Sequence, residues 1–132
     1  MAVIATDVTR LSNLVKMEVS PELAYCREVS VVNEAAAKSY VIGTVLGKVT
    51  ATGKYKICVQ SAVDGSQTAA AIVIAAKDVA ATTDTKVLTI IRGPSTISKV
   101  ALVLDASHST QAHKDAIYAA LETKGVQVLD AV

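Results

Sequence analysis

The hydrophobic residues of this chain are almost all small and aliphatic, and this restricts the core that it can build. They make up 52% of the 132 residues, but Trp and Phe are absent, and tyrosine is the only aromatic residue present. A domain of this size normally builds its core around several large rings, each of which buries about 150–250 Å². The sequence therefore predicts a core of many Ala, Val and Ile side chains, arranged in thin layers or shared with neighbouring subunits.

Length and charge restrict the organisation and the partners of the chain. The 132 residues fit one domain. The formal net charge is +1, with no basic run to neutralise phosphates and no aromatic surface on which bases could stack. The longest apolar stretch, residues 69–76, is far shorter than the roughly twenty residues of a membrane-spanning helix, and no secretory signal is visible. We therefore predict neither a nucleic-acid nor a membrane partner, and synthesis in the cytoplasm.

The first 22 residues differ from the rest of the chain. Residues 1–17 mix short apolar pairs with polar residues and show no sustained period. Ser20-Pro21 then interrupts the chain, because the residue before proline is restricted to extended conformations and proline cannot donate to a strand ladder. The pattern predicts an N-terminal arm over residues 1–22 and a β-rich domain over residues 23–132. Within the arm, two alternatives stay open: one helical turn in residues 11–17, or a terminal edge strand.

From residue 24 onward the hydrophobic period shifts towards two, which indicates β-strands. Gly43 and Gly47 interrupt one β-branched run, and glycine within a strand marks a bulge, a bend or the close approach of another backbone. Asp64-Gly65 is a strong turn signal. We predict links at residues 33–38 and 77–86, and strands at residues 25–32, 40–50, 54–60, 69–76, 87–91 and 126–129, with the second and third of these forming a hairpin. Residues 98–104 are expected to form a strand or an extended segment.

One helix is predicted, near the C-terminus. Ser109 or Thr110 can cap its free N–H groups, and Gly125 lies where a left-handed residue ends a helix. The chain is therefore expected to be mainly β with one C-terminal helix, a small β-rich fold with an extended N-terminal arm. The expected apolar face of the helix consists of Ala112, Ala116, Ile117, Ala120 and Leu121.

No arrangement of residues predicts catalysis or a metal site. His108 and His113 are five residues apart and miss the i, i+4 spacing that places two ligands on one helical face, so we interpret them as surface or packing residues. Asp105, Ser107 and His108 contain the residue types of a catalytic triad, but neighbours in a loop do not converge as a triad requires. Their expected role is to cap backbone N–H groups at the start of the helix.

The cysteines and the glycine spacings do not predict a catalytic or phosphate-binding site either. Cys26 and Cys58 show no CxxC spacing and lie in strand-like runs, so we expect buried free thiols and leave a disulfide open. Neither GxGxxG nor GxxxxGK[ST] occurs. The sequence predicts a binding or assembly protein, not an enzyme, with no cofactor and no small-molecule substrate.

An ordered set of segments resembles a known family. The segments are VIGTVLGKVTATGKY (41–55), AVDGSQTAAAIVI (62–74), KVLTIIRGP (86–94) and LETKGVQVL (121–129). Together they resemble the lambda-type head decoration proteins, which cement the capsids of tailed bacteriophages. The resemblance extends from residue 40 to the C-terminus. It departs from the family in its missing aromatic residues and in residues 24–38, which have no obvious counterpart.

The resemblance implies a capsid-surface protein made in the host cytoplasm. It implies homotrimers at three-fold positions of the expanded head, which stabilise the head against the pressure of packaged DNA. It also implies that the major capsid protein is the partner and that the N-terminal arm pairs with its strands on the shell.

The residues themselves support a hypothesis for the contact. An arm without its own core is typical of segments that bind by adding a strand to an exposed sheet edge. Alternatives stay open: the arm as an ordinary strand of the trimer, a different virion or tail protein with a β core, or a small enzyme or ligand-binding barrel using residues 105–113. The candidate capsid-binding residues are Val3, Ile4, Val8, Leu11, Leu14 and Val15.

Overall fold

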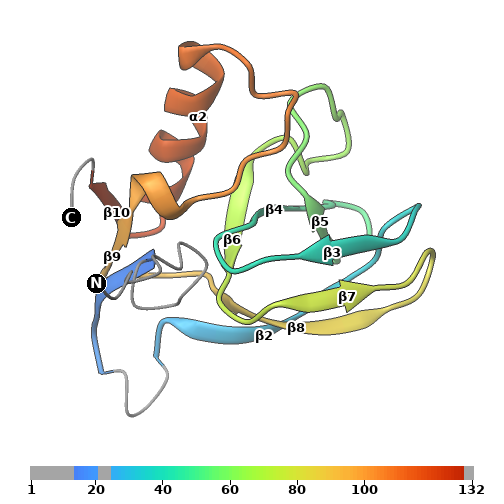
Figure 1. Ribbon diagram of the computed structural model, residues 1–132, viewed down its shortest axis with the longest axis horizontal. Coiled ribbons are helices and arrows are strands. Elements are labelled where there is room, and N and C mark those ends of the chain that lie inside the picture. The colour runs from blue at the N-terminus through green and yellow to red at the C-terminus, as the bar shows by residue number, and fades with distance from the viewer. Residues whose placement is uncertain (1–13, 21–24, 130–132) are drawn as a thin grey trace, which may run out of the picture.

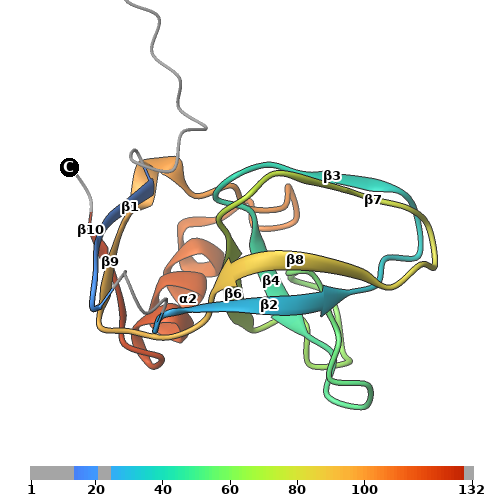
Figure 2. The ribbon, with the colours of Figure 1, turned by 90° about the horizontal axis from the view of Figure 1, so that it is seen from below.

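The protein is mainly β, with one α-helix near the C-terminus, as the sequence predicts. A computed structural model describes residues 14–20 and 25–129 (Figure 1). The described strands form a closed barrel, a three-stranded sheet and a separate two-stranded pair. In Figure 2 the three-stranded sheet lies at one end of the molecule, and the barrel lies beside it.

The barrel contains most of the predicted strands. β4 and β5 form the predicted antiparallel hairpin, and β2 and β8 pair antiparallel along their whole length, from Arg27 opposite Ile90 to Val32 opposite Thr85. The parallel pair Val32–Tyr55 closes the ring. Closure leaves every barrel strand with a neighbour on both sides, so no edge stays open. In ring order the strands are β2 (Arg27–Val32), β5 (Tyr55–Ile57), β4 (Val45–Lys48), β6 (Ala69–Val73) and β8 (Thr85–Ile90).

Among the described residues, the second sheet has no strand beyond either of its edges. β9 (Ser95–Ser98) lies in the centre, β1 (Val15–Glu18) pairs with it antiparallel, and β10 (Val126–Leu129) pairs with it parallel. The 3-10 helix η2 (Lys99–Ala101) and the helix α2 (Gln111–Glu122) lie between β9 and β10 in the chain. α2 packs against β10 and against β6 of the barrel, so it covers the junction of the two parts (Figure 1).

The predicted helix has the expected ends. The Thr110 side chain accepts the N–H of His113, and Gly125 adopts a positive φ of 84°. Fewer residues of the predicted apolar face of α2 are buried than expected. Ile117 and Leu121 are buried, whereas Ala112 and Ala116 are exposed, because only the side facing the barrel and β10 is covered.

Two strand predictions were wrong. The predicted loop at residues 77–86 contains β7 (Lys77–Val79), which pairs with β3 (Lys38–Tyr40), and the start of β8. Residues 98–104, predicted as a strand or an extended segment, contain the 3-10 helix η2, and the strand of this region is β9, which ends at Ser98. All four residues of β9 are buried although three are Ser or Thr, so its sequence shows no apolar pattern.

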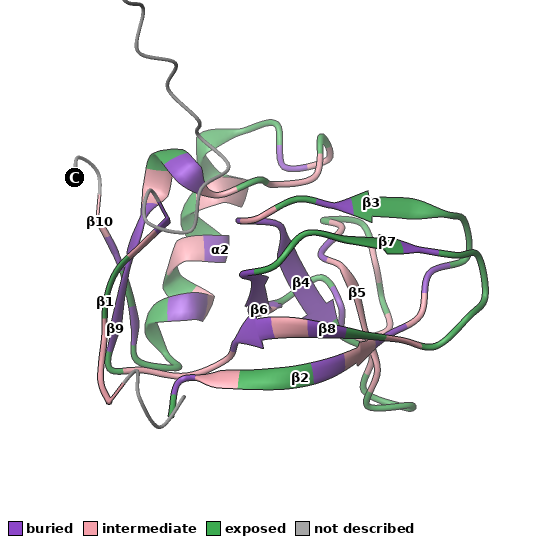
Figure 3. Ribbon diagram, turned by 60° about the horizontal axis from the view of Figure 1, so that its bottom comes forward, coloured by how far each residue is buried: buried purple, intermediate pink, exposed green. Residues whose placement is uncertain are grey.

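The core has the predicted small-aliphatic composition. Figure 3 shows the buried residues on β4, β6, β8 and β9 and along one side of α2. One cluster lies between the open sheet, α2 and the barrel, and includes Leu14, Ile72 and Ile97. The second surrounds Tyr40, the one tyrosine among the buried core residues described. Cys26 and Cys58 are both buried and free, so the disulfide left open by the sequence is absent.

The strand glycines mark close backbone approach, one of the predicted alternatives. A Cβ atom at Gly47 would collide with the backbone carbonyl of Ser66, and one at Gly43 would collide with that of Ala101. Gly43 also adopts a φ of 101°, which L-residues rarely tolerate. Glycine at these two positions therefore lets the backbone at Ser66 and at the end of η2 pack directly on the barrel.

Candidate functional site

The N-terminal segment enters the fold through β1, and this entry is the candidate functional site. β1 pairs with β9 along one edge, and among the described residues no strand covers its other edge. The register shifts between Val15 and Met17, which is a bulge-type irregularity. The side chains of Lys16 and Met17 are exposed, and Met17 keeps 49% of its surface accessible. An edge strand of this kind presents backbone groups to which a further strand can add.

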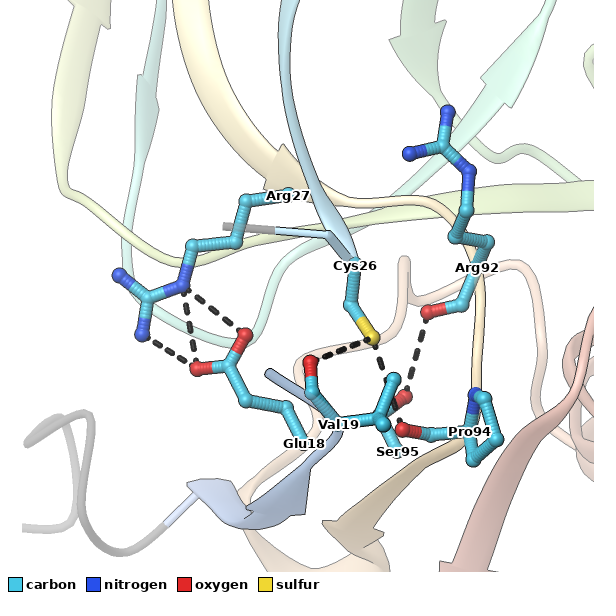
Figure 4. A network of polar contacts seen from close by, with 7 residues as sticks. All are labelled: Glu18, Val19, Cys26, Arg27, Arg92, Pro94 and Ser95. Atoms are coloured by element: carbon cyan, nitrogen blue, oxygen red, sulfur yellow. Dashed lines mark hydrogen bonds and ion pairs between the residues drawn. The ribbon is translucent and has the colours of Figure 1, made fainter. Parts of the chain in front are cut away.

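A buried carboxylate joins β1 to the barrel. The Glu18 side chain is only 6% exposed, and the Arg27 side chain, from β2, is 27% exposed. Arg27 Nη2 lies 2.5 Å from Glu18 Oε1, and Arg27 Nε lies 3.1 Å from both carboxylate oxygens, so the two side chains face each other in a forked pair (Figure 4). The hydrogen bond to Glu18 raises the pKa of Arg27, which keeps the guanidinium charged. Such paired, charge-assisted hydrogen bonds fix geometry as well as adding energy.

A second set of contacts surrounds the end of β1. The Val19 N–H donates to the Pro94 carbonyl at 2.9 Å. The fully buried thiol of Cys26 lies 3.5 Å from the same carbonyl oxygen and 4.0 Å from that of Val19 (Figure 4). The 93–94 turn, the end of β1 and the start of β2 therefore meet at one sulfur atom. Together with the Glu18–Arg27 pair, these contacts attach the end of β1 to the start of β2 and to the 93–94 turn.

Arg92 extends this junction towards the surface. Its Nη1 donates to the Tyr25 carbonyl at 2.6 Å, and its Nη2 lies 3.2 Å from Glu28 Oε2. The guanidinium also lies 5.7 Å from the centre of the Tyr25 ring. Both ion-pair partners are about half exposed, so this part contributes less energy than the buried pair.

The structure separates the predicted capsid-binding residues into two groups. Leu14 is fully buried and packs in the core cluster with Ile97, while Val15 is half-buried at the start of β1. The Leu14 side chain therefore contacts this chain's own core. The other predicted residues, Val3, Ile4, Val8 and Leu11, lie outside the described residues. Their role, and the division of the chain at residues 22 and 23, stay predictions.

Several exposed hydrophobic side chains were missed by the sequence reasoning. Val100, on η2, is 79% exposed, and Val29, on β2, is 56% exposed. Val29 belongs to the predicted alternating strand, but the face of β2 that points inward carries Ser30 and Val32. Period alone could not reveal this, because both faces of the strand carry apolar residues. Val41 and Val103 are partly exposed and line one shallow cavity with Thr44 and Ile57.

The residues of the excluded triad contact backbone atoms, and the only side-chain pair between them is Asp105 with Ser107. The Asp105 carboxylate accepts the N–H of Ser107 at 3.1 Å, and the Ser107 hydroxyl accepts the N–H of Gln60 at 3.0 Å. His108 is buried, with its Nε2 atom 3.0 Å from the Cys58 carbonyl oxygen. The hydrogen bonds from Ser107 lower the pKa of Asp105. Asp105 and Ser107 accept backbone N–H groups, as predicted, but these groups are not at the start of α2. The side chain of Thr110 caps that helix.

The described part of the chain holds no group of three or more His, Cys, Asp or Glu residues placed to bind a metal ion. Among residues 14–20 and 25–129, no helix combines the length and apolarity needed to cross a bilayer.

These features define a small β-barrel protein with an accessory three-stranded sheet, to which β1 adds an edge strand. Residues 5–126 match the family described as bacteriophage lambda head decoration protein D. The match covers most of the chain, and the chain therefore belongs to this family. The matched range includes residues 24–38 and most of the N-terminal segment, whereas the resemblance seen in the sequence began only at residue 40. The comparison with curated proteins found no match.

The family defines the broad role of the protein. Its members are structural proteins that decorate a phage capsid, and membership places the protein at the capsid surface of a virion.

Proposed function

We propose that this protein binds the outer surface of the mature phage head as a homotrimer at three-fold positions. It stabilises the head against the pressure of packaged DNA, contributes no catalysis and is synthesised in the host cytoplasm. Family membership over residues 5–126 is the observation that carries this proposal. A ligand that binds only the expanded lattice stabilises that lattice by mass action, and several linked contacts per trimer add avidity.

The proposed contact with the major capsid protein is made by the N-terminal segment. Two observations support this assignment: the outer edge of β1 has no partner strand among the described residues, and Glu18 and Arg27 hold β1 to the barrel. A segment that starts from a fixed strand and adds to a capsid strand gains backbone hydrogen bonds without rearranging the domain. In this proposal Val3, Ile4, Val8 and Leu11 contact the capsid, while Leu14 and Val15 position them.

The proposed trimer is supported by the exposed apolar side chains. Val100, Val103 and Val41 leave hydrophobic surface uncovered in the single chain. A cyclic trimer repeats one contact between two different surfaces three times, so both surfaces are buried at once. Sedimentation of the purified full-length protein tests this: a trimer is expected, and a stable monomer at micromolar concentration contradicts it.

The capsid contact is tested by deleting residues 1–13. This variant keeps Leu14, β1 and the Glu18–Arg27 pair, so its domain is expected to fold with an unchanged circular dichroism spectrum. Binding is measured by co-sedimentation with expanded shells of the cognate major capsid protein. We expect the full chain to bind and the deletion to lose most binding, because the added strand is missing.

The control for this deletion separates the segment from the rest of the surface. A variant with Val3, Ile4, Val8 and Leu11 all changed to Ser keeps the chain length and removes the apolar contacts. It should bind as weakly as the deletion. If the deletion binds shells as well as the full chain, the N-terminal segment is not the contact, and cryo-electron microscopy of the full-length complex then shows which surface is. If only the Ser variant binds fully, these four side chains are not the contacts.

A further inference from the structure

A partly uncovered apolar surface lies on the outer face of β2 and β8, which run side by side in Figure 2. Val29 lies opposite Leu88 in this strand pair, and it is more than half exposed. Two residues further along each strand, Val31 lies opposite Lys86. Residues directly opposite each other, and residues two apart on one strand, share one face of a sheet. These four residues therefore form one surface, the β2–β8 strip.

Lys86 gives the β2–β8 strip a positive charge. It is exposed and forms no ion pair within the described part of the chain. Lys54 and Lys56, by contrast, each lie within 3 Å of an aspartate oxygen, at 2.9 and 2.6 Å. The strip thus combines open apolar surface with a charge that its own chain does not pair.

A second apolar surface is the shallow cavity lined by Val41 and Val103, the Val103 groove. It has a volume of about 230 Å³ and shares no residue with the β2–β8 strip. Val41 and Val103 are partly exposed, and the half-buried Ile57 and Leu104 line the groove with them. Asp105 also lines it.

Asp105 gives the Val103 groove the opposite charge. Its carboxylate accepts the N–H of Ser107 at 3.1 Å, but it forms no ion pair with any described residue. The charge of Lys38 acts on this carboxylate from beyond ion-pair distance. The groove therefore presents apolar side chains beside an anion, whereas the strip presents them beside a cation.

We propose that the β2–β8 strip of one copy docks into the Val103 groove of the next copy, with Lys86 facing Asp105. A cyclic trimer needs two different surfaces on each chain that are complementary to one another. The strip and the groove meet this requirement, because both are apolar and their unpaired charges are opposite. Such charges at an apolar contact chiefly fix its orientation and its partner. The assignment rests on the proposed homotrimer and adds which surfaces form it.

The test is sedimentation equilibrium of the full-length protein and of one variant for each surface. Val29→Glu places an anion in the strip, where it would meet Asp105 of the neighbour. Val103→Lys places a cation in the groove, where it would meet the neighbour's strip lysine. Each change also removes apolar contact, so each should weaken association by roughly tenfold or more. Circular dichroism should show that both variants fold, since both positions are partly exposed.

A matched control and a mixture make the test specific. Val63→Glu changes a valine that is 96% exposed and belongs to neither surface, so it should leave the trimer intact. The Val103→Lys chain keeps an intact strip, and the Val29→Glu chain keeps an intact groove. Mixed in equal amounts, the two variants should therefore associate with each other more strongly than either does with itself. Failure of the mixture to associate overturns the pairing of strip with groove.

The charge pair is tested by Lys86→Gln. This variant should weaken association less than Val29→Glu does and should make it less sensitive to salt, because salt screens an ion pair at the edge of an interface. An unchanged salt dependence contradicts the contact between Lys86 and Asp105.

The remaining outcomes separate this assignment from the proposed function. A monomeric full-length protein contradicts the homotrimer itself. A trimer that persists in Val29→Glu and Val103→Lys overturns only the assignment of its surfaces. If Val29→Glu stays trimeric but binds capsid shells more weakly, the strip contacts the capsid protein, and the proposed docking between copies is wrong.

Discussion

The closed barrel and the open three-stranded sheet differ in how their strands are held. In the barrel every strand has a neighbour on both sides, and the ring closes on itself. In the sheet only β9 is paired on both sides, whereas β1 and β10 each leave an edge without a partner strand among the described residues. β1 therefore depends on side chains, chiefly Glu18, Arg27 and Cys26, for its attachment to the barrel. We therefore expect the closed barrel to contribute most of the stability, while the open sheet keeps an edge to which another strand can add.

The largest effect is expected from the barrel core. Leu46 is fully buried on β4, between β5 and β6, and packs in the cluster around Tyr40. Leu46→Ala should lower the free energy of unfolding by about 3–5 kcal/mol, because it removes buried methyl groups and leaves a cavity. Urea denaturation measures this. A loss below about 1 kcal/mol would show that the barrel interior is not the source of stability.

A smaller and more local effect is expected from the buried ion pair. Glu18→Ala should cost about 2 kcal/mol, less than for a fully buried pair, because Arg27 is 27% exposed and water can reach it. Hydrogen exchange should accelerate at β1 amides while barrel amides keep their protection. Faster exchange in β1 alone would show that β1 opens separately from the barrel.

The matched control is the Glu28–Arg92 pair, which is about half exposed on both sides. Glu28→Ala should cost less than about 1 kcal/mol. Equal costs for Glu18→Ala and Glu28→Ala, or acceleration spread evenly over barrel and sheet, would mean that β1 is not held separately by its side chains.

A separate effect is a pH dependence located at the barrel. Cys58 follows β5, its N–H donates to the Val45 carbonyl, and its thiol lies 3.3 Å from the Gln67 carbonyl. Burial, followed by the charge of Asp105, raises the pKa of Cys58 from 9.0 to about 11. The folded state thus favours the neutral thiol. The contribution is complete below pH 9 and is lost as the pH rises from about 9 to about 11.

Cys58→Ser isolates this contribution, because the hydroxyl keeps a hydrogen-bond donor and does not titrate in this range. The difference in unfolding free energy between the original protein and the variant should shrink as the pH rises from 9 to 11. Denaturant titrations at several pH values measure it. A difference that is constant across this interval would show that the thiol does not sense its burial in this way.

Features that depend on neighbours in the chain were predicted from the sequence. The β4–β5 hairpin, the Thr110 cap and the left-handed Gly125 were all visible, because turns and caps need only local residue types. For the ambiguous stretch at residues 11–17, the edge-strand alternative is confirmed over Val15–Glu18, while Leu14 has helical backbone and residues 11–13 lie outside the described residues.

Other features were decided by tertiary structure alone. β9 is buried through Ser95, Thr96 and Ser98, whose environment comes from strands distant in the chain, so no local pattern could reveal it. β7 has three residues, only one of them buried, and exists because β3 lies beside it.

The candidate sites divide in the same way. The sequence determined that the N-terminal segment carries apolar residues before a β domain, but only packing decided that Leu14 faces the core. The alternation of Val29 and Val31 was visible in the sequence, yet only the pairing of β2 with β8 brought Lys86 to the same face. The physical reason is common to all these cases. Local steric preferences and hydrogen bonds are encoded within a few residues, whereas burial and strand pairing depend on which distant segments meet.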